Sequence, residues 1–155
     1  MSEYFSLKGK KTVLTGALGF LGLETVRLFM TEGARICATD IFTRERANEL
    51  FADMPAENRH EIEYIPCDIT DADATDAMIA KAADHMGGID VLVNCAASAK
   101  IIPAHEMPEC EWEKTVKVSL FGAYHTCRAV FPFMKDHGGS IVNIASIAAL
   151  VGLPR

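Results

Sequence analysis

Short runs of apolar, largely β-branched residues alternate along the chain with longer segments in which apolar positions recur at helical spacing. The strand-like runs cover residues 10–16, 34–40, 61–68, 89–97 and 138–146, and the helix-like segments cover 20–32, 43–54, 72–86 and 108–136. Such alternation with short connections requires right-handed crossovers and a parallel sheet covered on both faces. The pattern therefore predicts an α/β fold with a doubly wound, five-stranded parallel sheet.

The apolar positions also predict which helix faces are buried. Leu21, Val26, Leu28 and Phe29 are available for the buried face of 20–32, which Gly33 should end. In the segment 108–136, Pro132 should kink or shorten the helix. The core residues expected there are Trp112, Val116, Val118, Leu120 and Ala123, and Phe121, Cys127 and Phe131 are expected on the outer side.

Composition and charge narrow the function classes. The chain has 155 residues, is 50% hydrophobic and 23% charged, and carries a net charge of −6 with no basic cluster, which disfavours nucleic acid as a partner. The N-terminus does not resemble a signal peptide, and no apolar run is long enough to span a membrane. The five cysteines form no CxxC pair and the five histidines show no ligand spacing, so we expect a cytoplasmic protein without a metal.

The glycine-rich segment TGALGFLG, residues 15–22, joins the first strand to the first helix. Gly16 permits a tight turn, Gly19 allows a ligand to approach the backbone, and Gly22 allows the helix to pack on the strand. A pyrophosphate could then bind at the helix N-terminus. No Lys-Ser/Thr follows the last glycine, so the segment is not a P-loop. Glycines alone are weak support, because a strand–helix turn can be glycine-rich without binding anything.

Carboxylates and small residues end the next strands. Asp40 lies at the tip of the second strand, near the offset of about 20 residues after Gly16 expected for a ribose-binding carboxylate. Such a carboxylate repels a 2′-phosphate, which favours NAD over NADP; the alternative is a helix N-cap or loop aspartate. Asp68 ends the third strand, where an N-cap is again an alternative. Asn94 ends the fourth strand, where small residues leave room for a flat ring.

These motifs together resemble the short-chain dehydrogenase/reductase family over essentially the whole chain. The matching segments are TGALGFLG, TD at 39–40, CDIT at 67–70, IDVLVNCAA at 89–97, WEKTVKVSLFGAY at 112–124 and GGSIVNIAS at 138–146. The resemblance implies a Rossmann-type NAD(P)-binding domain over residues 1–155. It also implies hydride transfer between nicotinamide and a small-molecule carbonyl or secondary alcohol in the full-length protein, and a homo-oligomer formed through the 108–136 helix.

The resemblance also implies roles for individual residues. The expected cofactor-binding residues are Gly16, Gly19, Phe20 and Leu21 at the pyrophosphate and nicotinamide side, Asp40 at the ribose, Asp68 and Ile69 at the adenine, and Asn94, Cys95, Ala96 and Ala97 at the middle of the cofactor. Ser146 would be catalytic, because it matches the serine that hydrogen-bonds the carbonyl and stabilises the oxyanion. Ser119 stands where the family has an asparagine in the proton relay, and its shorter side chain puts that relay in doubt. Phe20 stands where single-domain members usually have glycine, and NCAA replaces the common NNAG.

The family's Tyr-x-x-x-Lys pair is missing after Ser146. Tyr64 and Tyr124 are followed four residues later by Asp68 and Arg128. Tyr4 has Lys8 at the required spacing but precedes the first strand, so the match is accidental. The sequence therefore predicts the front, inactive part of a longer NAD-dependent oxidoreductase. The alternative is a natively short, non-catalytic dinucleotide-binding module.

Overall fold

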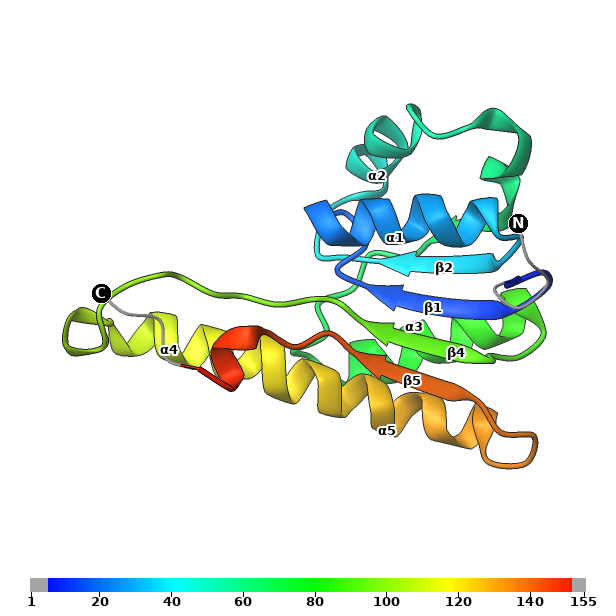
Figure 1. The fold of residues 1–155 in the computed structure, drawn as a ribbon. Helices are drawn as coiled ribbons and strands as arrows, with labels where there is room; N and C mark the ends of the chain where they lie inside the picture. Colours follow the sequence, from blue (N-terminus) through cyan, green and yellow to red (C-terminus); the bar gives the residue numbers. More distant parts are fainter. Residues whose placement is uncertain (1–5, 152–155) are drawn as a thin grey trace.

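A computed structural model describes residues 6–151, apart from the side chains of residues 57 and 58. Figure 1 shows a parallel sheet with helices on both faces. The strands are β1 (Lys11–Thr15), β2 (Arg35–Thr39), β3 (Ile62–Tyr64), β4 (Val91–Asn94) and β5 (Ser140–Asn143), in the spatial order β3-β2-β1-β4-β5. Every neighbouring pair is parallel. The predicted doubly wound, five-stranded α/β fold is confirmed.

The helices form two layers around this sheet. They are α1 (Phe20–Thr31), α2 (Arg44–Phe51), α3 (Ala72–Met86), α4 (Glu109–Val116) and α5 (Ala123–Met134), with a π-helical segment η4 (Lys117–Gly122) between the last two. Three short 3-10 turns complete the described chain: η2 (Ala56–Glu61), η3 (Ala104–Glu106) and η5 (Ile147–Ala149). On one face α1 and α2 bury Val26, Met30 and Phe51 against the sheet. On the other face α3 and α5 bury Ile79 and Val130.

Local sequence signals set the ends of these helices. The Thr43 hydroxyl accepts the Arg46 N–H at the start of α2, and the Asp71 carboxylate accepts the Ala74 N–H at the start of α3. Gly87 ends α3 in the left-handed conformation, with φ +73°. The predicted boundaries therefore agree with the structure to within a few residues.

The buried face of α1 differs from the prediction. Gly22, Val26 and Met30 are buried at intervals of four residues, and so they define the face that meets the sheet. Leu21 and Leu28 are 50% and 56% exposed, so their assignment to the buried face was wrong. Position 22 requires glycine, because a side chain there would collide with the preceding loop. The pattern of hydrophobic residues does not show this constraint.

The predicted long helix is divided by the π-helical segment η4, which rotates the faces of α4 and α5 relative to one another. For this reason Trp112 and Leu120 are exposed rather than in the core, at 62% and 65%. Cys127 packs against the core instead of pointing outward. Pro132 does not end the helix, since α5 continues to Met134.

The far edge of β5 has no partner strand within residues 6–151, and all four residues of this strand are exposed. Ile141 and Val142 contribute to this surface. Across the described ranges, none of the helices combines the length and apolar character that crossing a membrane requires.

Candidate functional site

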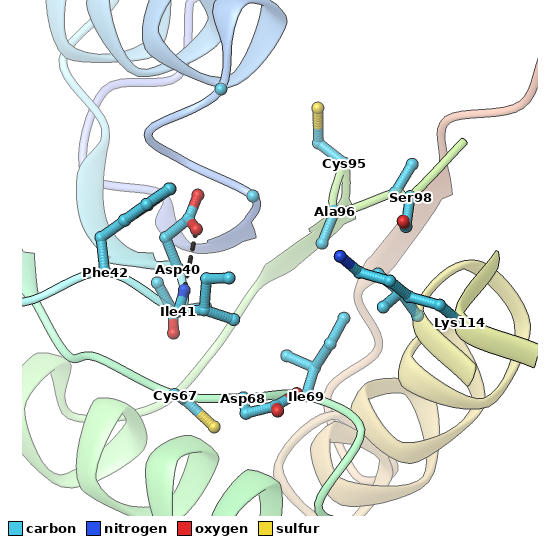
Figure 2. A pocket seen from close by; sticks show the side chains of 15 residues that line it. Asp40, Ile41, Phe42, Cys67, Asp68, Ile69, Cys95, Ala96, Ser98 and Lys114 are labelled. Carbon is cyan, nitrogen blue, oxygen red and sulfur yellow. Dashed lines mark hydrogen bonds between the residues drawn. The ribbon is translucent and has the colours of Figure 1, made fainter. Parts of the chain in front are cut away.

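A cavity of about 300 Å³ lies at the carboxyl ends of the strands, between the glycine-rich segment and α4 (Figure 2). Its lining consists of Gly16, Gly19, Thr39, Asp40, Ile41, Phe42, Cys67, Asp68, Ile69, Cys95, Ala96, Ala97, Ser98, Lys114 and Val118. Most of the predicted cofactor-binding residues are therefore brought together at one place. This is the edge at which doubly wound sheets bind their ligands.

The glycine-rich segment is packed backbone against backbone. Gly16 has φ +67°, and a Cβ there would lie 2.6 Å from both N and Cα of Ala96. A Cβ on Gly22 would lie 2.0 Å from the Gly16 carbonyl oxygen. Gly19 differs, because its Cβ would meet only the Gly16 oxygen at 3.4 Å. Gly16 and Gly22 are thus required by the fold, whereas Gly19 leaves open space at the cavity.

The start of α1 can accept an anion at this open space. Gly19 is the N-cap residue of the helix, and no side chain caps the first turn. The first N–H groups of an α-helix have no partner within the helix, and the helix dipole adds partial positive charge there. A phosphate group beside Gly19 would satisfy these donors.

Asp40 stands between the glycine-rich segment and the loop after β2. Its Oδ2 accepts the Leu18 N–H at 3.0 Å and its Oδ1 accepts the Ile41 N–H at 2.8 Å. The side chain is half-buried, and the cap of α2 is Thr43, so Asp40 is not a helix N-cap. Each carboxylate oxygen keeps a lone pair for a further donor. Asp40 is therefore placed to accept hydrogen bonds from a ribose at the cavity.

Tyr64 holds the loop after β2 through its hydroxyl group. Its hydroxyl donates to the carbonyl oxygen of Phe42 at 2.7 Å and lies 3.2 Å from that of Asp40. Burial raises the pKa of the Tyr64 phenol well above its ordinary value, and the Asp40 charge adds to that effect. Tyr64 is consequently a neutral structural donor.

The loop after β3 forms the floor of the cavity. Asp68 Oδ1 accepts both the Thr70 N–H at 2.9 Å and the Thr70 hydroxyl at 2.8 Å. The cap of α3 is Asp71, so the N-cap alternative does not hold for Asp68. The carbonyl oxygen of Ile69 lies 3.0 Å from Nδ1 of His125, which ties the loop to α5. Asp68 and Ile69 are thus held in position beside the cavity.

Asn94 lies outside the cavity, in a buried polar network. Its Oδ1 accepts from the Thr126 hydroxyl at 2.7 Å, and its Nδ2 donates to Asn143 Oδ1 at 2.8 Å. Nδ2 also lies 3.4 Å from the Cys127 sulfur. The side chain therefore joins β4 to β5 and α5. It contributes to the site through the strand it holds and does not face the cavity.

Phe20 and Leu21 also lie outside the cavity lining. Phe20 is the first residue of α1 and is 91% exposed, and Leu21 is 50% exposed. Both are adjacent in sequence to Gly19, which does line the cavity. Their predicted roles would require a ligand longer than the cavity, extending past the start of α1.

The two predicted catalytic serines lie beyond the cavity. Ser119 is in η4, and its Oγ lies 3.3 Å from the Ser98 nitrogen and 3.4 Å from the Ser98 carbonyl oxygen. Ser146 follows β5, where its hydroxyl accepts the Ala148 N–H at 3.2 Å and caps η5. Ser119 thus fastens the segment after β4, and Ser146 remains exposed at the carboxyl edge of the sheet.

The described tyrosines do not pair with Ser146 in the way the family's proton donor would. Tyr64 is on β3 and Ser146 follows β5, so they belong to opposite edges of the sheet. Tyr124 is 58% exposed on α5, and Arg128, four residues later, binds Asp76 at 2.7 Å. The Tyr4–Lys8 match lies partly outside the described residues.

Several cavity residues were not predicted as site residues from the sequence, and one of them, Val118, was expected in the core. Ile41 and Phe42 directly follow Asp40 at the end of β2. A search of the residues that follow each strand could therefore have found them. Lys114 and Val118 come from α4 and η4, one helical turn apart. Their spacing of four residues indicates a shared face. Sequence alone does not show that this face meets the cavity.

The cysteines are all free thiols, and two of them, Cys67 and Cys95, line the cavity. Burial raises the pKa of Cys95, and the nearby Asp40 carboxylate adds to the shift. Burial likewise raises the pKa of Cys37, to about 12. Within the part of the chain that the structure describes, no cluster of three or more His, Cys, Asp or Glu residues could hold a metal ion.

Comparisons with known proteins agree with this architecture. A family model described as short chain dehydrogenase matches residues 10–155. The chain is 37% identical to D-threitol dehydrogenase of Mycolicibacterium smegmatis, over 97% of this chain and 58% of that protein. It is 35% identical to 2,3-dihydro-2,3-dihydroxybenzoate dehydrogenase of Bacillus subtilis, over 96% of this chain and 56% of that protein.

A solved structure gives the same result. The crystal structure of a short-chain dehydrogenase/reductase from Brucella melitensis superposes with a TM-score of 0.86 at 33% identity, over 96% of this chain and 61% of that one. The chain thus spans somewhat more than half the length of the proteins that it matches.

Proposed function

The chain belongs to the short chain dehydrogenase family, and on that premise we propose that it is the dinucleotide-binding part of an NAD-dependent oxidoreductase. The whole protein would transfer hydride between nicotinamide and a small-molecule carbonyl or secondary alcohol. The observation that carries the proposal is the cavity at the carboxyl edge, with Gly19 beside the start of α1 and the Asp40 carboxylate bonded to the N–H of the adjacent Leu18.

The proposed preference for NAD rests on Asp40. A carboxylate at the tip of β2 can accept hydrogen bonds from the ribose hydroxyls of the adenosine. A 2′-phosphate at the same place would be repelled by the Asp40 charge. Because its two oxygens already hold the Leu18 and Ile41 N–H groups, the carboxylate cannot turn away without breaking these bonds.

The other residues of the cavity are proposed to bind successive parts of the dinucleotide. The pyrophosphate would bind at Gly19, and the adenine would lie over Asp68 and Ile69. The segment Cys95–Ala97 would support the middle of the cofactor, beside Gly16. The open surface at Gly19 and the backbone contact between Gly16 and Ala96 fit a ligand that passes close to the main chain.

Ser146 is proposed to donate a hydrogen bond to the carbonyl oxygen of the substrate and to stabilise negative charge on it. Its exposed position after β5 leaves the hydroxyl hydrogen free to do so, because that hydroxyl acts as an acceptor toward Ala148. Bound NAD(H) supplies the hydride chemistry. We propose that the proton comes from a Tyr-x-x-x-Lys helix outside this chain, since Tyr64 and Tyr124 are unsuited to that role.

The substrate class and assembly are likewise proposals. The relatives are named as dehydrogenases of D-threitol and of a dihydrodiol acid, both of which carry secondary hydroxyl groups. An exposed apolar surface on α4, η4 and α5 supports a homo-oligomer formed through this helical region; its large members are Trp112, Leu120, Phe121 and Phe131. The free cysteines support a reducing, cytoplasmic location.

A non-catalytic dinucleotide-binding module is the second candidate. The observation that favours it is the position of Ser119, whose short side chain contacts the Ser98 backbone and is poorly placed to hold a relay water as well. This candidate predicts cofactor binding without turnover.

The test uses the whole protein with NAD and a panel of secondary alcohols. Ser146→Ala should lower kcat roughly 100-fold or more while leaving the Kd for NADH unchanged. Ser140→Ala is the matched control, because Ser140 is an exposed serine at the opposite end of β5. Full turnover by the Ser146 variant would contradict its proposed role. NADH binding by the wild type without turnover of any alcohol would support the binding module instead.

A further inference from the structure

Two carboxylates and one lysine line the cavity, so its formal charge is negative before any ligand binds. Its ionisable lining consists of Asp40 and Asp68, which are acidic, Lys114, and the two thiols described above. A dinucleotide brings two further negative charges in its pyrophosphate. Resting on the proposed function, we propose that Lys114 is a binding residue that attracts and holds the phosphate groups of the cofactor.

The two lysines nearest to Lys114 in the sequence, one before α4 and one directly after it, are already paired. Lys100 forms an ion pair with Glu111, and Lys117 forms one with Glu113 at 3.2 Å. These pairs use the two acidic side chains nearest to Lys114 along the helix. Lys114 itself has no ion pair or side-chain hydrogen bond to the described residues.

The helix spacing explains why Lys114 is left without a partner. Ion pairs on a helix form between residues three or four positions apart. The residues four positions away are Cys110 and Val118, which cannot pair with an ammonium group. Glu111, three positions away, is held by Lys100. The sequence around α4 therefore neutralises Lys117 and leaves the charge of Lys114 available.

The position of Lys114 directs this charge to the cavity. Lys114 and Val118 lie one turn apart and line the same wall. Figure 2 shows the Lys114 side chain extending from its helix toward the segment that contains Ala96 and Ser98, with its nitrogen at the cavity end. This segment packs against Gly16 of the glycine-rich loop. The ammonium group thus lies in the cavity beside this segment, which adjoins the glycine-rich loop that carries the proposed phosphate position.

Phosphate recognition also fits the chemistry of the lysine side chain better than a contact to the acidic residues. Asp40 and Asp68 hold donors of their own loops, and neither carboxylate forms an ion pair with Lys114 in the structure. A flexible ammonium that carries three donors can follow a phosphate without fixed geometry. If Lys114 were only a solvated surface residue, its removal would leave the affinity for phosphate-bearing ligands unchanged.

The experiment measures Kd by calorimetry for ADP-ribose, which carries the pyrophosphate, and for adenosine, which does not. Lys114→Met should weaken ADP-ribose binding roughly three- to tenfold at low salt, and the loss should shrink as salt is added. Adenosine binding should stay within twofold, and Lys114→Arg should restore most of the affinity. Lys117→Met is the matched control, because it removes an equal charge from the same helical region outside the cavity, and it should change neither Kd.

Several outcomes would overturn the inference. Unchanged ADP-ribose binding in Lys114→Met would do so, as would an equal loss for adenosine, which would indicate a change of shape rather than of charge. An equal loss in Lys117→Met would indicate a general charge effect. Equal urea midpoints of the variants exclude unfolding as the cause. If the wild type binds NADH but the variants do not differ, only this inference fails; if it binds neither NADH nor ADP-ribose, the proposed function fails with it.

Discussion

Replacing Gly19 by alanine separates the ligand-binding role of the glycine-rich segment from its structural role. Gly19 has φ −73° and ψ 166°, which any residue adopts. An alanine there gains stability by restricting the unfolded chain and loses a similar amount as a poorer N-cap, so the free energy of unfolding should change by less than roughly 0.5 kcal/mol. The new methyl group would stand in the open space beside the start of α1.

Binding should respond differently from stability. The methyl group would keep a pyrophosphate from the first N–H groups of α1, and each charge-assisted hydrogen bond lost costs about 1.5–3 kcal/mol. The loss of one such bond corresponds to a roughly 10- to 150-fold weaker Kd for NADH. Gly19→Ala should therefore fold normally and bind NADH poorly.

Gly16→Ala is the matched comparison, because it adds the same methyl group to the same loop. The left-handed backbone costs about 1–2 kcal/mol, and a Cβ at 2.6 Å from the Ala96 backbone forces a further displacement. This variant should lose roughly 3 kcal/mol or more of stability. Urea unfolding and NADH titration measure both quantities. Wild-type affinity for NADH in Gly19→Ala, or a loss of stability as large as that of Gly16→Ala, would contradict the ligand-binding role of Gly19.

Two further predictions concern residues around the cavity. Because the pKa of Cys95 is raised, its thiolate forms at higher pH than in the unfolded chain, so alkylation should be slow at neutral pH and accelerate in alkaline buffer. Bound NADH should slow the alkylation of Cys95 further and leave that of the exposed Cys110 unchanged. Peptide mass spectrometry measures both rates, and equal protection of Cys95 and Cys110 would contradict the proposed site. Thr126→Val should lower the free energy of unfolding by about 1–3 kcal/mol, because Asn94 loses a buried donor. Thr126→Ser keeps the hydroxyl and should lose much less in urea unfolding, whereas equal losses would contradict this role of the hydrogen bond.

The parts of the fold that depend on periodicity could be predicted from the sequence. The strand runs 10–16 and 89–97 contain β1 and β4, and together with the helix-ending glycines they identified the sheet correctly, because each element follows a local rule. The exposure of Trp112 and Leu120 could not be predicted, since it depends on the π-helical turn, which no local pattern announced. A uniform helical period carried across this turn placed both residues on the wrong face.

The candidate site also contains residues that could be predicted from the sequence and residues that could not. Strand-end residues such as Asp40 and Asp68 could be selected because the carboxyl edge of a parallel sheet is a known place for ligands. Asn94 was selected by the same rule, yet its partners Thr126 and Asn143 come from distant elements that turn its side chain away from the cavity. Lys114 does not follow a strand, so this rule did not select it. Its position at the cavity depends on the tertiary contacts that place α4.

The most direct test of the central claim is a titration of the protein with NADH and NADPH under identical conditions, followed by intrinsic or nicotinamide fluorescence. The half-buried Asp40 carboxylate should favour NADH by at least about tenfold, since a 2′-phosphate at the same place would meet a like charge. Asp40→Asn should reduce this preference by weakening NADH binding and removing the repulsion of NADPH. Tighter NADH binding that depends on Asp40 is the result we predict, and equal or tighter NADPH binding by the wild type would contradict the account.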